Sequence, residues 1–169
     1  MSKIILVLGG ARSGKSRFAE QIGERSDDTL VYIATAQAFD AEMTARIARH
    51  RDDRPPRWQT VECPLEIVGA IEAYDAPGQT ILIDCLTLWL SNLMLGDHDC
   101  DASSTALAAA LGTAKSTVIL VSNEVGQGIV PDNALARQFR DEAGWLNQKI
   151  AQCADEVWFI TAGLAHRLK

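Results

Sequence analysis

The feature that most constrains the fold is a glycine-rich octapeptide that directly follows a short apolar run near the N-terminus. The apolar run is residues 3–8 (KIILVL), and the octapeptide reads Gly9-Gly10-Ala11-Arg12-Ser13-Gly14-Lys15-Ser16. This is the pattern G-x-x-x-x-G-K-[ST], in which glycines let the backbone curl around phosphate and the next helix presents its positive end to it. Such a pattern can arise by chance in a glycine turn, but here a predicted strand precedes it and a predicted helix follows. We therefore predict a nucleotide site in which Lys15 meets the β- and γ-phosphates.

Alternation of strand and helix patterns predicts the rest of the architecture. The expected strands are near-continuously apolar, as is usual in a parallel sheet covered on both faces, and fall on residues 3–8, 30–34, 80–84, 117–121 and 156–160, with a weaker candidate at 59–62. The expected helices are residues 13–24, 40–53, 106–114 and 134–151, whereas the polar residues 97–104 are expected to form a surface loop. Together these patterns predict an α/β fold of the P-loop NTPase type. We expect a doubly wound, mostly parallel sheet flanked by helices, in a single domain spanning residues 1–169.

Composition excludes several classes of partner. The formal net charge is -6 and the pI is about 5.0, so the surface as a whole repels nucleic acid and anionic lipid. No apolar run reaches the roughly 20 residues that span a bilayer. The four cysteines form no CxxC pair, which favours buried or free thiols over a metal or redox site. These observations fit a cytoplasmic enzyme that binds neither nucleic acid nor a membrane.

A carboxylate ends the predicted strand at residues 80–84. An isolated aspartate after an apolar run is more often a helix cap. Beside a phosphate-binding loop, however, an acid at the carboxyl end of a neighbouring strand commonly holds Mg²⁺. We therefore predict that Asp84 and the Ser16 hydroxyl hold Mg²⁺.

A basic cluster surrounds one of the three histidines. Arg46, Arg49, Arg51, Arg54 and Arg57 lie on either side of His50. The simplest interpretation is a solvated helix face in which Asp52 and Asp53 pair with arginines. With a nucleotide nearby, a second interpretation becomes attractive: a neutral imidazole nitrogen attacks an α-phosphorus, and guanidinium groups stabilise the phosphoryl oxygens. His98 and His166 have no comparable setting and are predicted to be surface residues, His166 near a frayed C-terminus.

The segment that follows the predicted strand at residues 117–121 is a second candidate region. Asn123 and Glu124 should sit at the crevice end of the sheet, where Glu124 could orient Mg²⁺ or accept a proton from a hydroxyl substrate. Equally, both side chains could only cap and brace the loop that precedes Pro131. A guanine-reading N-K-x-D stretch is absent from the sequence, which weighs against a regulatory GTPase.

Six motifs, in order, resemble one enzyme family over essentially the whole chain. They are GGARSGKS, IAT, DAEMTARIARHRDDRP, DCLTLWLSNLM, VSNEVGQGIVP and FRDEAGWLNQKIA. The family is the bifunctional adenosylcobinamide kinase/adenosylcobinamide-phosphate guanylyltransferase of cobalamin biosynthesis. The resemblance implies two reactions: ATP or GTP phosphorylates adenosylcobinamide, and GTP then donates GMP to adenosylcobinamide phosphate through a guanylylated histidine, releasing pyrophosphate.

The resemblance also implies particular site residues and an assembly. The guanylylated histidine falls on His50. The nucleotide site falls on the octapeptide Gly9 to Ser16 and on Ala34, Thr35, Ala36, Arg51, Asp52, Asp53, Arg54, Glu62 and Asp84. A homo-oligomer is expected, most often a trimer. Trp89, Leu90 and Leu93 could line a corrinoid pocket, although a place in the core is the simpler expectation for each.

Two other functions compete with this interpretation. A P-loop small-molecule kinase would use the same octapeptide without nucleotidyl transfer, and it would never carry GMP on His50. A nucleotide-dependent regulatory module would hydrolyse nucleotide slowly and would have no small-molecule acceptor.

Overall fold

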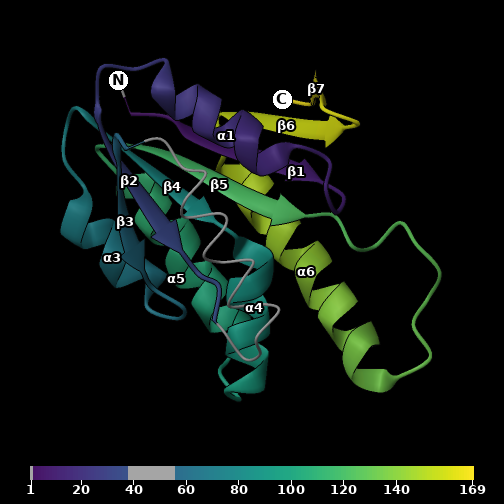
Figure 1. Ribbon diagram of the computed structural model, residues 1–169. Coiled ribbons are helices and arrows are strands. Elements are labelled where there is room, and N and C mark those ends of the chain that lie inside the picture. The colour runs from purple at the N-terminus through teal and green to yellow at the C-terminus, as the bar shows by residue number, and fades with distance from the viewer. Residues whose placement is uncertain (1, 38–55) are drawn as a thin grey trace.

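The computed structural model describes residues 2–37 and 56–169, and a seven-stranded sheet forms its centre (Figure 1). The order across the sheet is β3-β2-β4-β5-β1-β6-β7. All neighbouring strands run parallel except β6 and β7. The strands are β1 (Ile4–Gly9), β2 (Thr29–Ala34), β3 (Trp58–Glu62), β4 (Gln79–Asp84), β5 (Thr117–Asn123), β6 (Glu156–Thr161) and β7 (Leu164–Arg167).

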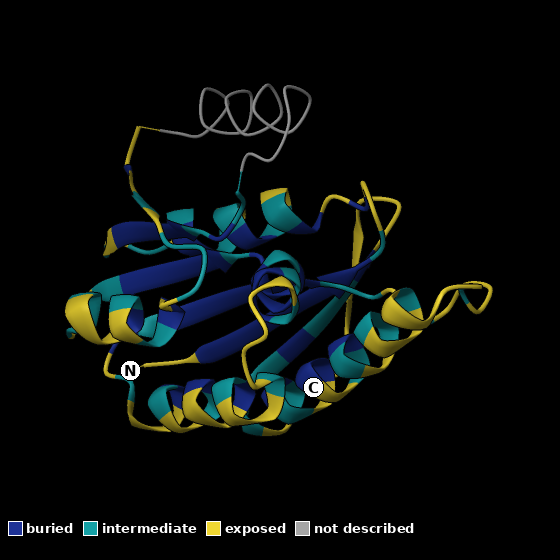
Figure 2. Cartoon of the chain, turned by 90° about the horizontal axis from the view of Figure 1, so that it is seen from below, coloured by how far each residue is buried: buried dark blue, intermediate teal, exposed yellow. Residues whose placement is uncertain are grey.

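Helices cover both faces of the sheet within the described ranges. One apolar cluster joins alternate strand residues such as Leu6 and Ile83 to α3, α4, α5 and α6. The other joins the intervening residues, such as Val7 and Leu82, to α1. Figure 2 shows the central strands as buried and the outer helix faces as exposed, whereas the edge strand β7 is exposed. The helices are α1 (Lys15–Glu24), α3 (Ile67–Tyr74), α4 (Leu86–Leu95), α5 (Cys100–Thr113) and α6 (Ala134–Cys153).

The strand order changes direction at β1. The chain leaves β1 through α1 and enters β2, which is separated from β1 by β4 and β5, whereas β6 lies on the other side of β1. In an open parallel sheet, such a change of direction leaves room for a ligand beyond the strand ends. The octapeptide follows β1 at this point.

The predicted fold class is confirmed, with strand bounds that differ from the expected ones by no more than two residues at either end. The weaker candidate at residues 59–62 is a strand, β3. The expected helices at residues 13–24 and 134–151 are present as α1 and α6. The expected helix at residues 40–53 lies outside the described residues. No helix within the two described ranges is long and apolar enough to cross a membrane, and all four cysteines are free thiols.

Two expectations are wrong. Residues 97–104 are not wholly a loop, because α5 begins at Cys100 and the Asp99 side chain accepts a hydrogen bond from the backbone N–H of Ala102 at 2.9 Å. The polar residues there form the N-cap and the exposed first turn of a helix, so they do not mark a loop. The C-terminus is not frayed either, because His166 lies in β7 opposite Phe159. His98 and His166 are exposed, as expected.

Candidate active site

The carboxyl ends of five parallel strands bring the described candidate residues to one edge of the sheet. Ala34 at the end of β2 pairs with Glu62 of β3 on one side and with Asp84 of β4 on the other. Gly9 at the end of β1 pairs with Asn123 of β5. The structure therefore aligns Glu62, Ala34, Asp84, Asn123 and Gly9 along the carboxyl edge of the sheet. The Glu62 side chain is exposed there, and it makes no hydrogen bond or ion pair with the described residues.

The octapeptide forms a tight loop that leads into α1. Gly14 is the N-cap of α1 with φ 95°, a left-handed conformation that favours glycine. Arg12 also has a positive φ, 53°. The Lys15 ammonium group donates to the carbonyl of Gly10 at 3.0 Å across the loop, and Lys15 is only 9% exposed. A buried ammonium group and a helix N-terminus at one point make an anion-binding site.

The first position of the loop requires glycine, because neighbouring atoms leave no room for a Cβ there. A Cβ on Gly9 would lie 2.5 Å from Ser13 Oγ and 2.8 Å from the carbonyl oxygen of Ile160 in β6. Gly10 differs, because a Cβ there would meet nothing within 4 Å. The Ser13 hydroxyl oxygen is buried and has no hydrogen-bond partner among the described residues.

We expect Gly9→Ala to lower the free energy of unfolding by about 1–3 kcal/mol, because the sheet backbone at Ile160 must move to admit the methyl group. Gly10→Ala is the matched control and should stay within about 0.5 kcal/mol of the parent. Urea unfolding of both variants measures the difference. Equal stability of the two variants would contradict the packing around Gly9.

The carboxylate at the end of β4 and the hydroxyl of Ser16 in α1 are oxygen ligands of the kind that Mg²⁺ prefers. Tyr32 donates its hydroxyl to Asp84 Oδ2 at 2.8 Å, while Oδ1 accepts no hydrogen bond from the described residues. The Ser16 hydroxyl lies one residue beyond Lys15, in the first turn of α1. Among the described residues no three His, Cys, Asp or Glu side chains gather as a metal cage. Mg²⁺ rarely uses such a cage, and one carboxylate with a hydroxyl, water and phosphate oxygens is a usual set for it.

Thr35 is a fixed point beside this carboxylate. It is fully buried, its hydroxyl donates to the carbonyl of Cys85 at 2.7 Å, and that hydroxyl accepts from the Cys85 N–H at 2.8 Å. Asn92 of α4 donates to the Thr35 carbonyl at 2.9 Å. These bonds set the position of the chain at Ala34 to Ala36, where the nucleotide site was predicted.

The thiol next to Asp84 is not a nucleophile. Burial, followed by the nearby Asp84 carboxylate, raises the pKa of Cys85 to about 11. A thiol with that pKa stays protonated at neutral pH and reacts slowly.

A buried polar network holds the end of β5. The Ser122 hydroxyl donates to Asn147 Oδ1 of α6 at 2.7 Å, and the Asn123 N–H donates to the Thr87 hydroxyl at 2.7 Å. Glu124 then braces the loop, because its carboxylate accepts from the Gly126 N–H at 2.6 Å. This contact braces the loop, and the role of Glu124 toward Mg²⁺ or a hydroxyl substrate stays a prediction.

The remaining basic residues and His50 do not join this edge of the sheet within the described part of the chain. His50, Arg51, Asp52, Asp53 and Arg54 fall outside the described residues. Arg57 is placed away from the carboxyl edge of the sheet, since it precedes β3 at the opposite edge. Its guanidinium group donates to the carbonyls of Glu24 and Ser26 at 3.3 and 3.1 Å.

Sequence reasoning missed Tyr32 and Asn92, which position Asp84 and Thr35. Tyr32 carries the only hydroxyl within the otherwise apolar stretch LVYIA, a signal that could have been noticed. Asn92 interrupts the apolar letters of α4 in the same way and is buried.

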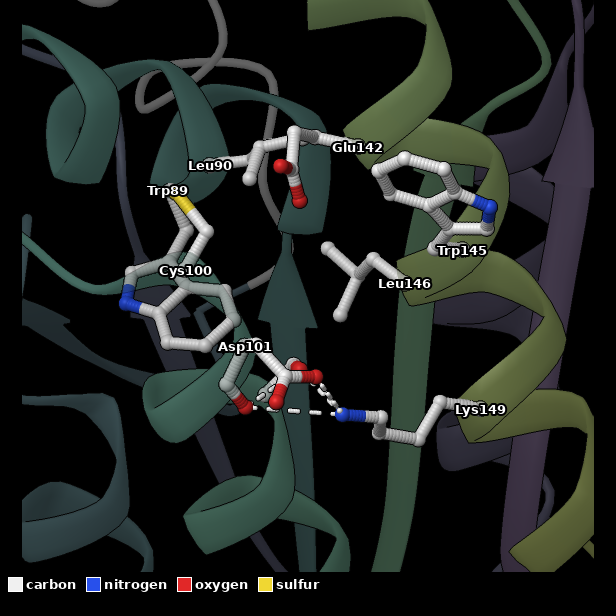
Figure 3. Close-up of a pocket in the computed structure, with 9 residues that line it drawn as sticks. Trp89, Leu90, Cys100, Asp101, Glu142, Trp145, Leu146 and Lys149 are labelled. Carbon is white, nitrogen blue, oxygen red and sulfur yellow. Dashed lines mark hydrogen bonds and ion pairs between the residues drawn. The ribbon is translucent and has the colours of Figure 1, made fainter.

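A separate pocket of about 280 Å³ opens between α4, α5 and α6, on the face of the sheet that these helices cover (Figure 3). The Glu142 carboxylate points into it, and Lys149 at its lower end is paired with Asp101. Trp89 and Leu90 contribute to its wall but are each 2% exposed, and the Trp89 indole N–H donates to the Leu65 carbonyl at 2.8 Å. Leu93 is 4% exposed. All three are core residues, as the simpler expectation had it.

Solved structures with a similar backbone support the fold alone. A prototypical ATPase from the type III secretion system of pathogenic bacteria matches with a TM-score of 0.55 at 11% identity, over 98% of this chain and 56% of that one. A structural-study target from Pyrococcus horikoshii OT3 matches with a TM-score of 0.60 at 8% identity, over 99% and 86%.

Sequence comparisons are more specific. Pseudomonas aeruginosa has a bifunctional adenosylcobalamin biosynthesis protein, CobP, that is 49% identical over 97% of this chain and 96% of its own length. The Salmonella typhimurium protein of that description, CobU, is 44% identical over 98% of this chain and 99% of its own length. The model of the family described as cobinamide kinase/cobinamide phosphate guanyltransferase matches residues 5–168. With the glycine-rich loop and the strand-end carboxylate in place, the chain belongs to the cobinamide kinase/cobinamide phosphate guanyltransferase family.

Proposed function

We propose that this chain carries out two successive transfers in adenosylcobalamin biosynthesis. ATP or GTP first phosphorylates the aminopropanol hydroxyl of adenosylcobinamide. GTP then gives GMP to adenosylcobinamide phosphate, yielding adenosylcobinamide-GDP and pyrophosphate. The single observation that carries this proposal is the family match over residues 5–168. The buried Lys15 at the start of α1 supplies the phosphate-binding part of the chemistry. No observation favours a kinase that lacks the second transfer.

In the first transfer, the loop holds the triphosphate and the acceptor hydroxyl attacks the γ-phosphorus. The backbone N–H groups of residues 9–16 and the Lys15 ammonium group stabilise charge on the phosphate oxygens. Ser16 and Asp84 would hold Mg²⁺, which neutralises phosphate charge when bound. Tyr32 keeps the Asp84 carboxylate in place through its 2.8 Å hydrogen bond.

In the second transfer, His50 is the nucleophile. A neutral ring nitrogen forms a bond to the α-phosphorus, the bond to the pyrophosphate oxygen breaks, and GMP remains on the ring as a phosphoramidate. A phosphate oxygen of adenosylcobinamide phosphate then attacks the same phosphorus and releases the imidazole. Arg51 and Arg54 stabilise the phosphoryl oxygens, with Asp52 and Asp53 beside them. Ala34, Thr35, Ala36 and Glu62 contact the nucleoside, Glu62 by accepting from ribose hydroxyls or from a guanine N–H edge.

The two reacting phosphorus atoms are two phosphate groups apart on one nucleotide. A single site can serve both only if the triphosphate binds in two registers or if the segment that carries His50 moves. We propose that one of these changes separates the two steps.

Incubation with α-labelled GTP tests the proposal directly. We expect the protein to retain label after denaturation, through a bond that acid breaks and base does not, as a phosphoramidate behaves. Added adenosylcobinamide phosphate should remove that label. A protein that phosphorylates adenosylcobinamide but takes up no label would be the kinase-only alternative.

The proposed setting follows from the same function. Residues 1–169 would form one transferase domain that works in the cytoplasm as a homo-oligomer, with a trimer favoured. Its partners would be adenosylcobinamide, its phosphate and GTP or ATP, without nucleic acid or membrane.

A further inference from the structure

The turn between β6 and β7 has an unusual conformation for two consecutive residues. Ala162 has φ 51° and Gly163 has φ 78°, as in the tight hairpin turns whose two central residues are both left-handed. The flanking pair is Thr161 opposite Leu164. Residues 161–169 are all exposed, so packing in the core does not explain where this turn lies.

The turn contacts the phosphate loop, about 150 residues earlier in the chain. The Gly163 N–H donates to the carbonyl of Ser13 at 2.8 Å. The Cβ position of Gly14 lies 3.5 Å from the Gly163 Cα. Gly9 pairs with Ile160 of β6. The hairpin therefore touches the loop at its first glycine, at Ser13 and at Gly14.

The bond to the Ser13 carbonyl fixes the orientation of a whole peptide group. In a planar trans peptide, the C=O and the N–H of the next residue point in opposite directions. Turning the Ser13 carbonyl toward Gly163 therefore turns the Gly14 N–H the other way. Gly14 is the N-cap of α1, so its N–H is among the donors at the helix start, where an anion binds. A reversed peptide would present a carbonyl oxygen to the phosphate instead.

The loop needs such a restraint because its own sequence is permissive. Glycine adopts many backbone conformations at little cost, and three of the eight loop residues are glycine. Within the loop, the Ser13 N–H bond to the Gly10 carbonyl is long, at 3.4 Å. The external bond from Gly163 is shorter and better placed to select one orientation.

The strand that carries the turn is itself anchored. The Lys3 ammonium group pairs with Glu156 at the start of β6, and Arg167 of β7 lies 3.6 Å from the same carboxylate. The Lys169 ammonium group donates to the carbonyls that end α6, at 2.6 Å for Ala154. These contacts hold the short hairpin against the sheet, so the turn is a fixed support for the loop.

We propose that Gly163 is a positioning residue for the nucleotide: its N–H holds the Ser13–Gly14 peptide with the Gly14 N–H facing the phosphates. The inference rests on the proposed function only in that a di- or triphosphate occupies the loop. It assigns a role in substrate binding to the C-terminal hairpin, which the sequence pattern did not reveal.

Gly163→Ala tests the idea, and the chain offers a matched control. Gly78 also has φ 78°, and a Cβ at either position would meet nothing within 4 Å. Gly78 precedes β4 at the opposite end of the sheet, however, away from the loop. Both Ala variants thus place a Cβ at the same positive φ, and we expect both to lower the melting temperature by similar amounts. Only Gly163→Ala should move the turn away from Ser13.

The measurement is GDP affinity in the presence of Mg²⁺, by calorimetry on the full chain. We expect Gly163→Ala to bind GDP about tenfold or more weakly than the parent, as loss of a donor to a charged group predicts. Gly78→Ala should bind as the parent does. Gly163→Asn should recover much of the affinity, because asparagine tolerates a positive φ better than alanine. That recovery also keeps the test decisive if the Ala variant folds poorly.

Equal GDP affinity for the parent, Gly163→Ala and Gly78→Ala would overturn the positioning role. Because GDP cannot donate GMP with loss of pyrophosphate, this result is independent of the second transfer. A parent protein that takes up GMP from GTP while Gly163→Ala binds GDP normally would refute the hairpin proposal and leave the proposed function standing.

Discussion

Replacing His50 with asparagine is expected to abolish guanylyl transfer and to leave phosphorylation of adenosylcobinamide near the parent rate. Asparagine keeps a similar size and a polar side chain but has no nitrogen lone pair able to attack phosphorus. Loss of a covalent nucleophile should lower the rate of GMP transfer by about 1000-fold or more. The first transfer does not use the imidazole, so it should survive. Separate assays with γ-labelled ATP or GTP and with α-labelled GTP measure the two rates.

His98→Asn and His166→Asn are the matched controls. Both histidines are exposed, one after α4 and one in β7. Each control should keep both transfers. Continued GMP transfer by His50→Asn would show that another group carries the nucleotide, and loss of both reactions would show that His50 serves the phosphate site itself.

Lys15→Met should impair both transfers together, in contrast to the His50 variant. The ammonium group is nearly buried and spans the loop to the Gly10 carbonyl. Methionine retains much of the side-chain length without the charge that stabilises the phosphate oxygens. We expect each rate to fall by about 100- to 1000-fold, the usual cost of removing one fixed donor from a transferring group.

Lys149→Met separates the loss of charge at the loop from a general effect of losing a lysine. Lys149 of α6 pairs with Asp101 at 2.7 Å and also donates to Ser104 of α5 at 2.8 Å. Its loss should leave both rates unchanged. If Lys15→Met retained one of the two transfers at the parent rate, the two reactions would not share this loop.

Much of the fold was predictable because its signals are local. A strand buried on both faces needs a continuous apolar run, and the runs around Leu6, Ile83 and Leu120 have little else in them. The start of α5 was mistaken for loop because the helix presents its first turn to solvent, where polar residues cost nothing. α4 was not predicted, since LTLWLSNLML is apolar on almost every side and lacks a 3.6-residue period.

The site was predictable only where its chemistry lies within one short segment. The octapeptide predicts its own loop, and Asp84 could be placed because parallel strands end at a common edge. The tie between Gly163 and Ser13 could not be predicted, because it depends on β6 lying beside β1. Arg57 shows that closeness in sequence does not place a residue in the site. It lies seven residues after His50, but it directly precedes β3, so it lies at the amino end of the parallel strands.

The C-terminal hairpin also supplies β7, the edge strand of the sheet beside β6. β6 pairs with β1 on one side, and without β7 its other side would offer unpaired N–H and C=O groups along an apolar segment that includes Val157, Phe159 and Ile160. Such a bare edge is a template for pairing with a strand of another molecule. β7 covers it with only four residues, and Arg167 and Lys169 add charge there. β7 thus replaces an apolar edge with a short, charged one, which disfavours pairing with another molecule.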